Sequence, residues 1–115
     1  MLYLARGGDT ERYRGAIIHI EASQFAPEEA NIAAYRNGRI SGPQFRDAYL
    51  RQLWSLWQRD RIMFVDLIDL ISTADITLVD RWGDEPWAPR RVLAAVLGQL
   101  AQQRKSLGRP AQKTA

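Results

Sequence analysis

The chain has 115 residues, of which 46% are hydrophobic, and it contains no cysteine. This length fits one domain, and the missing cysteines exclude disulfides, thiolate nucleophiles and thiolate metal sites. The formal net charge is +3, but Arg104, Lys105, Arg109 and Lys113 lie together at the C-terminal end without an acidic residue, so the preceding part carries +3 − 4 = −1. We therefore expect a single α/β domain over 1–103 and a basic flexible tail over 104–115. Sequence-specific binding of nucleic acid is not expected, because such binders carry a basic stripe on the folded surface.

No apolar run approaches the roughly eighteen residues of a membrane span, and the run at the N-terminus is too short for a signal peptide. We expect a cytoplasmic protein that does not contact a membrane. The absence of cysteine is compatible with a reducing compartment.

Two short strands are predicted near the N-terminus, over 2–5 and 16–20, with a turn at Gly7-Gly8-Asp9 between them. The link of about nine residues is short for a helical crossover between parallel strands. The two strands therefore either pair antiparallel or are joined by an extended surface loop.

Three helices are predicted in the middle of the chain. The first starts at Pro27, where acidic residues follow, and ends at Asn37-Gly38. The second runs from Ser41 to Arg59, with Ser41 and Gln44 spaced as a capping box, and the third follows Asp60 as its cap. The second helix carries two adjacent apolar stripes, namely Phe45, Tyr49, Leu53 and Leu56, and Leu50, Trp54 and Trp57.

A third strand is predicted over 76–79 and a last helix from about Pro89 to about Gln103. The element order predicts an α/β fold with a small three-stranded sheet, at least partly parallel, flanked by about four helices.

Three stretches carry a resemblance to a known family. They are Leu4 to Ile20, the helix segment 44–53 in which Phe45 and Tyr49 precede Leu53, and Ile76-Thr77-Leu78-Val79 with Arg90-Arg91-Val92-Leu93. Together they resemble the domain of unknown function family four-eight-eight, in its short YeaO-like form. The resemblance implies the same α/β order over most of the chain up to about Gln103.

This chain departs from the family at its polar signature. Members often carry Asp-Arg with Trp-Pro-Arg-Gly after the second strand, where this chain has Glu21-Ala22-Ser23-Gln24-Phe25. Before the last helix, Ala88-Pro89-Arg90 replaces the family's Cys-His-Arg or Asn-His. The resemblance therefore implies a divergent member that has lost any chemistry those residues perform.

The segment from Asp80 to Arg91 is the predicted site, because ligands of open α/β sheets bind outside the carboxyl ends of strands, where the next helix begins. The predicted ligand-binding residues are Asp80, Arg81, Trp82, Trp87, Arg90 and Arg91. Backbone N–H groups at the helix start and the arginines favour an anion, with a tryptophan as a stacking face. The alternative is that the tryptophans fold back on the sheet and hold the loop in place.

Two carboxylates, Glu21 and Asp80, emerge at one edge if the second and third strands are parallel. They would suit acid–base chemistry, unless each pairs with a nearby arginine such as Arg81 or Arg90. His19, the only histidine, is expected to be a packed core residue, and no metal site or cofactor is predicted.

These features favour a non-catalytic binding protein for a small anionic, nucleotide-like ligand or a protein partner. One alternative is a hydrolase or transferase acting on a nucleotide-like substrate with Glu21 and Asp80. Another is a small regulatory or antagonist protein that acts by protein–protein contact. A homodimer is also predicted, because Trp54 and Trp57 exceed what one core covers and a three-stranded sheet has open edges.

Overall fold

The computed structural model describes residues 1–114, with side chains described up to Arg104. Strands β1 (Leu2–Arg6), β2 (Ala16–His19) and β3 (Ile76–Asp80) form one sheet in the order β1-β3-β2, and both outer strands are parallel to β3. The α/β fold with a small parallel sheet is therefore confirmed. The open question about the first two strands is also settled. They do not pair, and the connection between them crosses the sheet with one 3₁₀ turn, η1 (Thr10–Arg12).

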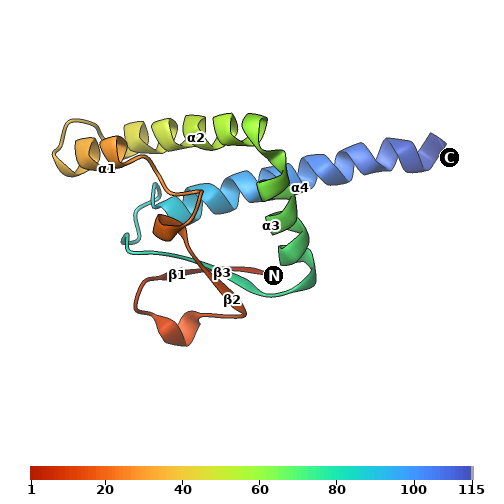
Figure 1. Ribbon diagram of the computed structural model, residues 1–115, viewed down its shortest axis with the longest axis horizontal. Coiled ribbons are helices and arrows are strands. Elements are labelled where there is room, and N and C mark those ends of the chain that lie inside the picture. The colour runs from red at the N-terminus through yellow and green to blue at the C-terminus, as the bar shows by residue number, and fades with distance from the viewer. Residues whose placement is uncertain (115) are drawn as a thin grey trace.

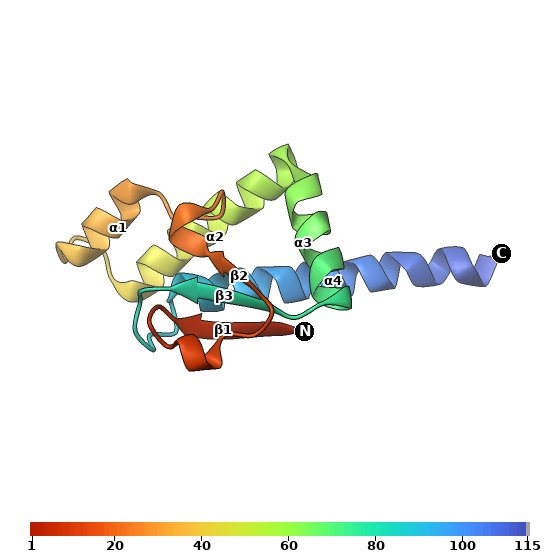
Figure 2. The ribbon, with the colours of Figure 1, turned by 60° about the horizontal axis from the view of Figure 1, so that its bottom comes forward.

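All four helices lie on one side of this sheet (Figure 1). They are α1 (Glu29–Arg36), α2 (Gly42–Arg59), α3 (Arg61–Thr73) and α4 (Pro89–Thr114). The view in Figure 2 shows that α4 runs along the strands and that α3 crosses α4. Buried side chains of β3, α2, α3 and α4 form the main core, among them Leu78, Tyr49, Phe64 and Leu93. In this part of the chain, no helix combines the length and the apolar character that crossing a membrane requires.

The connection from β1 to β2 covers part of the opposite face of the sheet. Thr77, in the middle of β3, is buried there, and its hydroxyl accepts from the Arg14 N–H and donates to the Arg14 carbonyl, both at 2.7 Å. The connection and these bonds stand where an α/β sheet ordinarily carries a second helix layer. On this face Ala5, Thr77 and Val79 are buried, whereas Ile17 and His19 of the edge strand β2 are exposed.

Local signals in the sequence set most helix boundaries. The predicted capping box is present: the Gln44 N–H donates to the Ser41 hydroxyl at 3.2 Å, and the Ser41 N–H donates to the Gln44 side chain at 2.8 Å. Asp60 occupies the N-cap position of α3, but its side chain makes no capping hydrogen bond, contrary to the prediction. Helix α4 continues to Thr114, past residue 103, where we expected a tail to begin.

Candidate functional site

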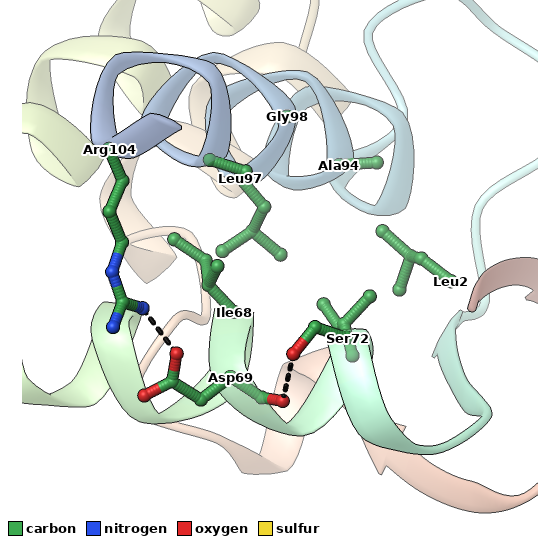
Figure 3. A pocket seen from close by; sticks show the side chains of 10 residues that line it. Leu2, Ile68, Asp69, Ser72, Ala94, Leu97, Gly98 and Arg104 are labelled. Carbon is green, nitrogen blue, oxygen red and sulfur yellow. Dashed lines mark hydrogen bonds and ion pairs between the residues drawn. The ribbon is translucent and has the colours of Figure 1, made fainter. Parts of the chain in front are cut away.

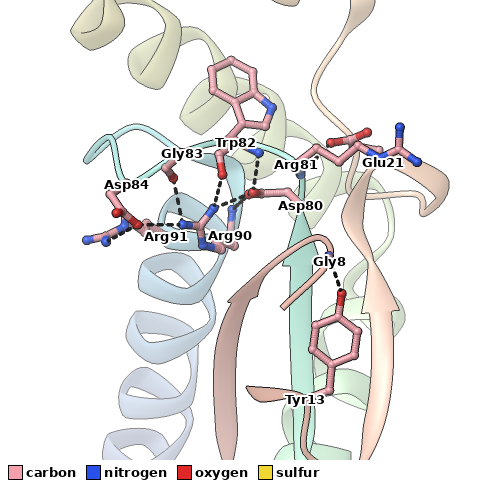
Figure 4. Close-up of polar contacts among 10 residues, drawn as sticks. All are labelled: Gly8, Tyr13, Glu21, Asp80, Arg81, Trp82, Gly83, Asp84, Arg90 and Arg91. Carbon is pink, nitrogen blue, oxygen red and sulfur yellow. Dashed lines mark hydrogen bonds and ion pairs between the residues drawn. The ribbon is translucent and has the colours of Figure 1, made fainter. Parts of the chain in front are cut away.

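The carboxyl end of β3 holds a buried ion pair that organises the predicted site (Figure 4). Asp80 Oδ1 accepts from Arg90 Nη1 at 2.6 Å, and the side chains of Asp80 and Arg90 are 0% and 5% exposed. Asp80 Oδ2 accepts from the Arg90 backbone N–H at 2.7 Å, in the first turn of α4. The aspartate therefore caps the helix whose free N–H groups were expected to bind an anion.

Both Nη atoms of the Arg90 guanidinium also bond to the protein backbone. The guanidinium donates to the Trp82 carbonyl at 3.0 Å and the Gly83 carbonyl at 2.8 Å, and Asp84 lies 3.5 Å away. Asp80 Oδ1 accepts additionally from the Trp82 N–H at 2.9 Å. Asp80 and Arg90 therefore form the structural pair that the sequence offered as the alternative, and both carboxylate oxygens and both Nη atoms already hold partners within the protein. This burial and pairing argue against the acid–base role that the hydrolase or transferase hypothesis assigns to Asp80.

The two tryptophans of the segment belong to an aromatic cluster with α1 and α2. Trp82 is buried and stacks on Phe45 at 4.8 Å and on Tyr35 at 5.4 Å between ring centroids. Trp87 donates its indole N–H to the Tyr35 hydroxyl at 2.9 Å and packs over Gly42, where a Cβ atom would lie 2.2 Å from the indole ring. The tryptophans thus anchor the loop, as the alternative proposed, although they pack on helices and not on the sheet.

The other predicted residues lie around this core. Arg81 and Arg91 are exposed, and Glu21 follows β2 at the same edge as Asp80, as expected for parallel strands. One Glu21 oxygen accepts from the Arg81 N–H at 3.0 Å. No group of three or more histidine, aspartate or glutamate side chains among the described residues is placed to hold a metal ion.

The prediction for His19 is wrong. It lies at the end of the edge strand β2, opposite Val79, and its side chain is exposed. Residues alternate between the two faces of a strand, so Ile18 packs on the core while His19 projects toward the face without helices. The apolar neighbours of His19 suggested a packed position, whereas the strand order β1-β3-β2 makes β2 an edge strand.

Two polar hollows lie beside the ion pair at the carboxyl edge of the sheet. The first, of ≈ 400 Å³, is here called the arginine hollow. It is lined by Leu4, Ala5, Arg6, Asp9, Arg12, Asp84, Arg90 and Arg91. The second, of ≈ 370 Å³, is here called the β2-edge hollow. It is lined by Gly7, Gly8, Tyr13, His19, Glu21, Ala22, Val79, Asp80 and Arg81. Sequence reasoning missed Arg6 and Arg12, although Arg6 ends a strand just as Asp80 does.

A third, apolar hollow of ≈ 460 Å³ lies between α3 and α4, away from this edge (Figure 3). Leu2, Ile68, Ile71 and Leu97 line it, and Gly98 leaves room at its α4 wall, where an added Cβ would meet no atom within 4 Å. Arg104 and Asp69 form an ion pair at its rim. Trp54 and Trp57, the predicted interface residues, pack partly against the core, and Trp57 also lies edge-on to Phe64 at 5.7 Å.

Comparison with protein-family models, curated proteins and solved structures found no match to this chain. The resemblance to the domain of unknown function family four-eight-eight therefore stays a prediction.

The buried Tyr49 makes the stability of the folded protein depend on pH in the alkaline range. Its hydroxyl donates to the Phe25 carbonyl at 2.6 Å, and burial, together with the negative charge of Asp80, raises the pKa of Tyr49 far above its ordinary value. In the unfolded chain the phenol ionises near pH 10, as tyrosine ordinarily does, whereas the folded protein keeps the proton. The stabilisation is therefore complete below about pH 10, and the free energy of unfolding falls as the pH rises above that value.

We expect Tyr49→Phe to flatten this alkaline decline in urea unfolding between pH 7 and 11.5. At neutral pH the variant should lose about 1–3 kcal/mol, because the buried Phe25 carbonyl loses its donor. Tyr3→Phe, at a residue without a side-chain hydrogen bond among those described, is the matched control and should keep the decline. An equally steep decline in Tyr49→Phe would show that another group causes it.

Proposed function

We propose that this chain is a non-catalytic binding protein for a small anionic ligand, held in the arginine hollow. The observation that carries the proposal is the convergence of three exposed arginines from separate elements: Arg6 ends β1, Arg12 lies in η1, and Arg91 begins α4. Arg6 and Arg12 make no ion pair with any described residue, and Arg91 reaches only Asp84, at 4.0 Å. Guanidinium groups with free donors bind phosphate and carboxylate oxygens in pairs.

The position of the hollow in the fold supports the proposal. The chain leaves β1 toward the face without helices, where Arg14 bonds to Thr77, and leaves β3 toward α4 on the other face. Ligands of open parallel sheets bind in the crevice where neighbouring strands send their connections to opposite sides. The arginine hollow lies beside this crevice, between the end of β1 and the start of α4.

The charge balance of the hollow favours a small anion. Three exposed guanidinium groups face two carboxylates, Asp9 and Asp84, while Arg90 is neutralised by Asp80. The excess of 3 − 2 = +1 suits one phosphate ester or a similar multi-oxygen anion. Because the tryptophans lie in the aromatic cluster, base stacking by Trp82 or Trp87 is not part of this proposal.

Binding of inorganic phosphate and of adenosine monophosphate, measured by isothermal titration calorimetry at low salt, tests this proposal. We expect Arg6→Gln and Arg12→Gln each to weaken binding roughly tenfold, which is about 1.4 kcal/mol for the loss of a charge-assisted contact. Arg39→Gln, an exposed arginine of the α1–α2 loop, is the matched control and should bind as the wild type does. Absent binding at millimolar concentration, or equal loss in the control, would overturn the proposal.

We also propose that the chain forms a homodimer through the apolar hollow between α3 and α4. The recess has apolar walls, formed by Leu2, Ile68, Ile71 and Leu97. A two-fold dimer buries the same patch of both copies, so it would remove these walls from water on both subunits. This surface replaces Trp54 and Trp57 as the predicted interface.

Sedimentation velocity at micromolar concentration tests the dimer. Gly98→Arg should give a 13.1 kDa monomer species, because the new side chain fills the recess with a charge. Gly98→Ala adds a Cβ into open space and should leave the dimer intact. A monomeric wild type would refute the dimer, and a Gly98→Arg dimer would place it on another surface.

A further inference from the structure

The β2-edge hollow, on the other side of the β1–η1 connection, contains one carboxylate and one guanidinium that do not pair. Glu21 and Arg81 both line it, yet neither forms an ion pair with any residue that the structure describes. The Arg81 backbone N–H holds one Glu21 oxygen at 3.0 Å, which fixes the carboxylate in place. The second Glu21 oxygen accepts no hydrogen bond from the described residues.

The remaining walls add donors and a small apolar floor. The Tyr13 hydroxyl accepts from the Gly8 N–H at 3.2 Å, and its own proton has no acceptor within the part of the chain described. Figure 4 shows the Tyr13 ring standing in front of the strands, with its hydroxyl toward Gly8. The His19 imidazole is exposed on the same side, and Val79 is buried beneath. The hollow therefore offers one negatively charged hydrogen-bond acceptor, the Glu21 carboxylate, and several hydrogen-bond donors.

We propose that the β2-edge hollow binds a small zwitterion of the α-amino acid class. The ammonium group donates to the free oxygen of Glu21, and the carboxylate accepts from the Tyr13 hydroxyl and the Arg81 guanidinium. The volume of ≈ 370 Å³ lies in the range of small-molecule sites. This site is distinct from the arginine hollow and does not depend on the function proposed for it.

Charge complementarity selects a zwitterion over a simple ion. A ligand with only a negative charge would pair with Arg81 but would bring its charge close to the fixed Glu21 carboxylate. A ligand with only a positive charge would pair with Glu21 but would lie close to the Arg81 guanidinium. Like charges brought together in a partly enclosed site weaken binding, whereas a ligand with both charges satisfies both walls.

The test is a titration of the wild-type chain with each of the twenty common amino acids, followed by the backbone amide signals in proton–nitrogen NMR spectra. We expect at least one amino acid to shift the amides of Gly8, Glu21 and Arg81 at millimolar concentration. Its carboxamide, which lacks the carboxylate, and its deaminated analogue, which lacks the ammonium group, should each bind at least about tenfold more weakly.

Matched variants assign the binding to the hollow. Glu21→Gln keeps an oxygen for the Arg81 N–H but removes the charge, so it should weaken amino acid binding about tenfold, as should Arg81→Gln. Glu28→Gln and Arg39→Gln, both exposed and outside the hollow, should bind normally. Arg6→Gln should also bind amino acids normally, which separates this site from the arginine hollow.

Three results would overturn the proposal. The first is the absence of amide shifts with all twenty amino acids at about 10 mM, a concentration that detects even weak specific sites. The second is equal binding of the deaminated analogue. The third is that Glu28→Gln weakens amino acid binding as much as Glu21→Gln does. Failure of phosphate binding in the arginine hollow would leave this proposal unaffected.

Discussion

The buried pair of Asp80 and Arg90 is the constraint on which the rest of this structure depends. A buried ion pair costs several kcal/mol of desolvation for each ion, and the cost is recovered only where further hydrogen bonds complete both groups. Here the carboxylate also accepts from two backbone N–H groups, and the guanidinium also donates to two carbonyls. The pair thereby joins the end of β3, the following loop and the first turn of α4 into one unit, and it directs Trp82 into the aromatic cluster.

This pair also decides where a ligand can bind. In many parallel sheets the free N–H groups of the helix after a strand receive an anion. In this chain the protein's own carboxylate takes that place, so the free polar groups of the carboxyl edge lie on either side of it. Arg6, Arg12 and Arg91 line the hollow between the end of β1 and the start of α4, while Tyr13, Glu21 and Arg81 line the hollow beside the ends of β2 and β3. The two hollows differ in charge, and we propose different ligands for them.

Local chemistry made much of the fold predictable, whereas the site depended on contacts between distant residues. The sequence predicted the third strand and the helix that follows Asp80, because a β-branched run and a proline-initiated amphipathic segment are local signals. It could not show that Trp87 packs over Gly42, because that contact joins residues far apart in the chain. His19 was misplaced because strand order, which no local pattern carries, makes β2 an edge strand. Arg6 could have been predicted by the same strand-end argument that identified Asp80.

A double-mutant cycle on Asp80 and Arg90 tests the central claim most directly. The free energy of unfolding in urea would be measured for the wild type, Asp80→Asn, Arg90→Met and the double variant. The structure predicts that each single change costs about 3–5 kcal/mol, because it leaves a buried charge without its partner, and that the double variant recovers at least about 2 kcal/mol of the summed loss. Single losses that simply add would mean that the two groups do not stabilise each other, which would contradict a structural pair at this edge.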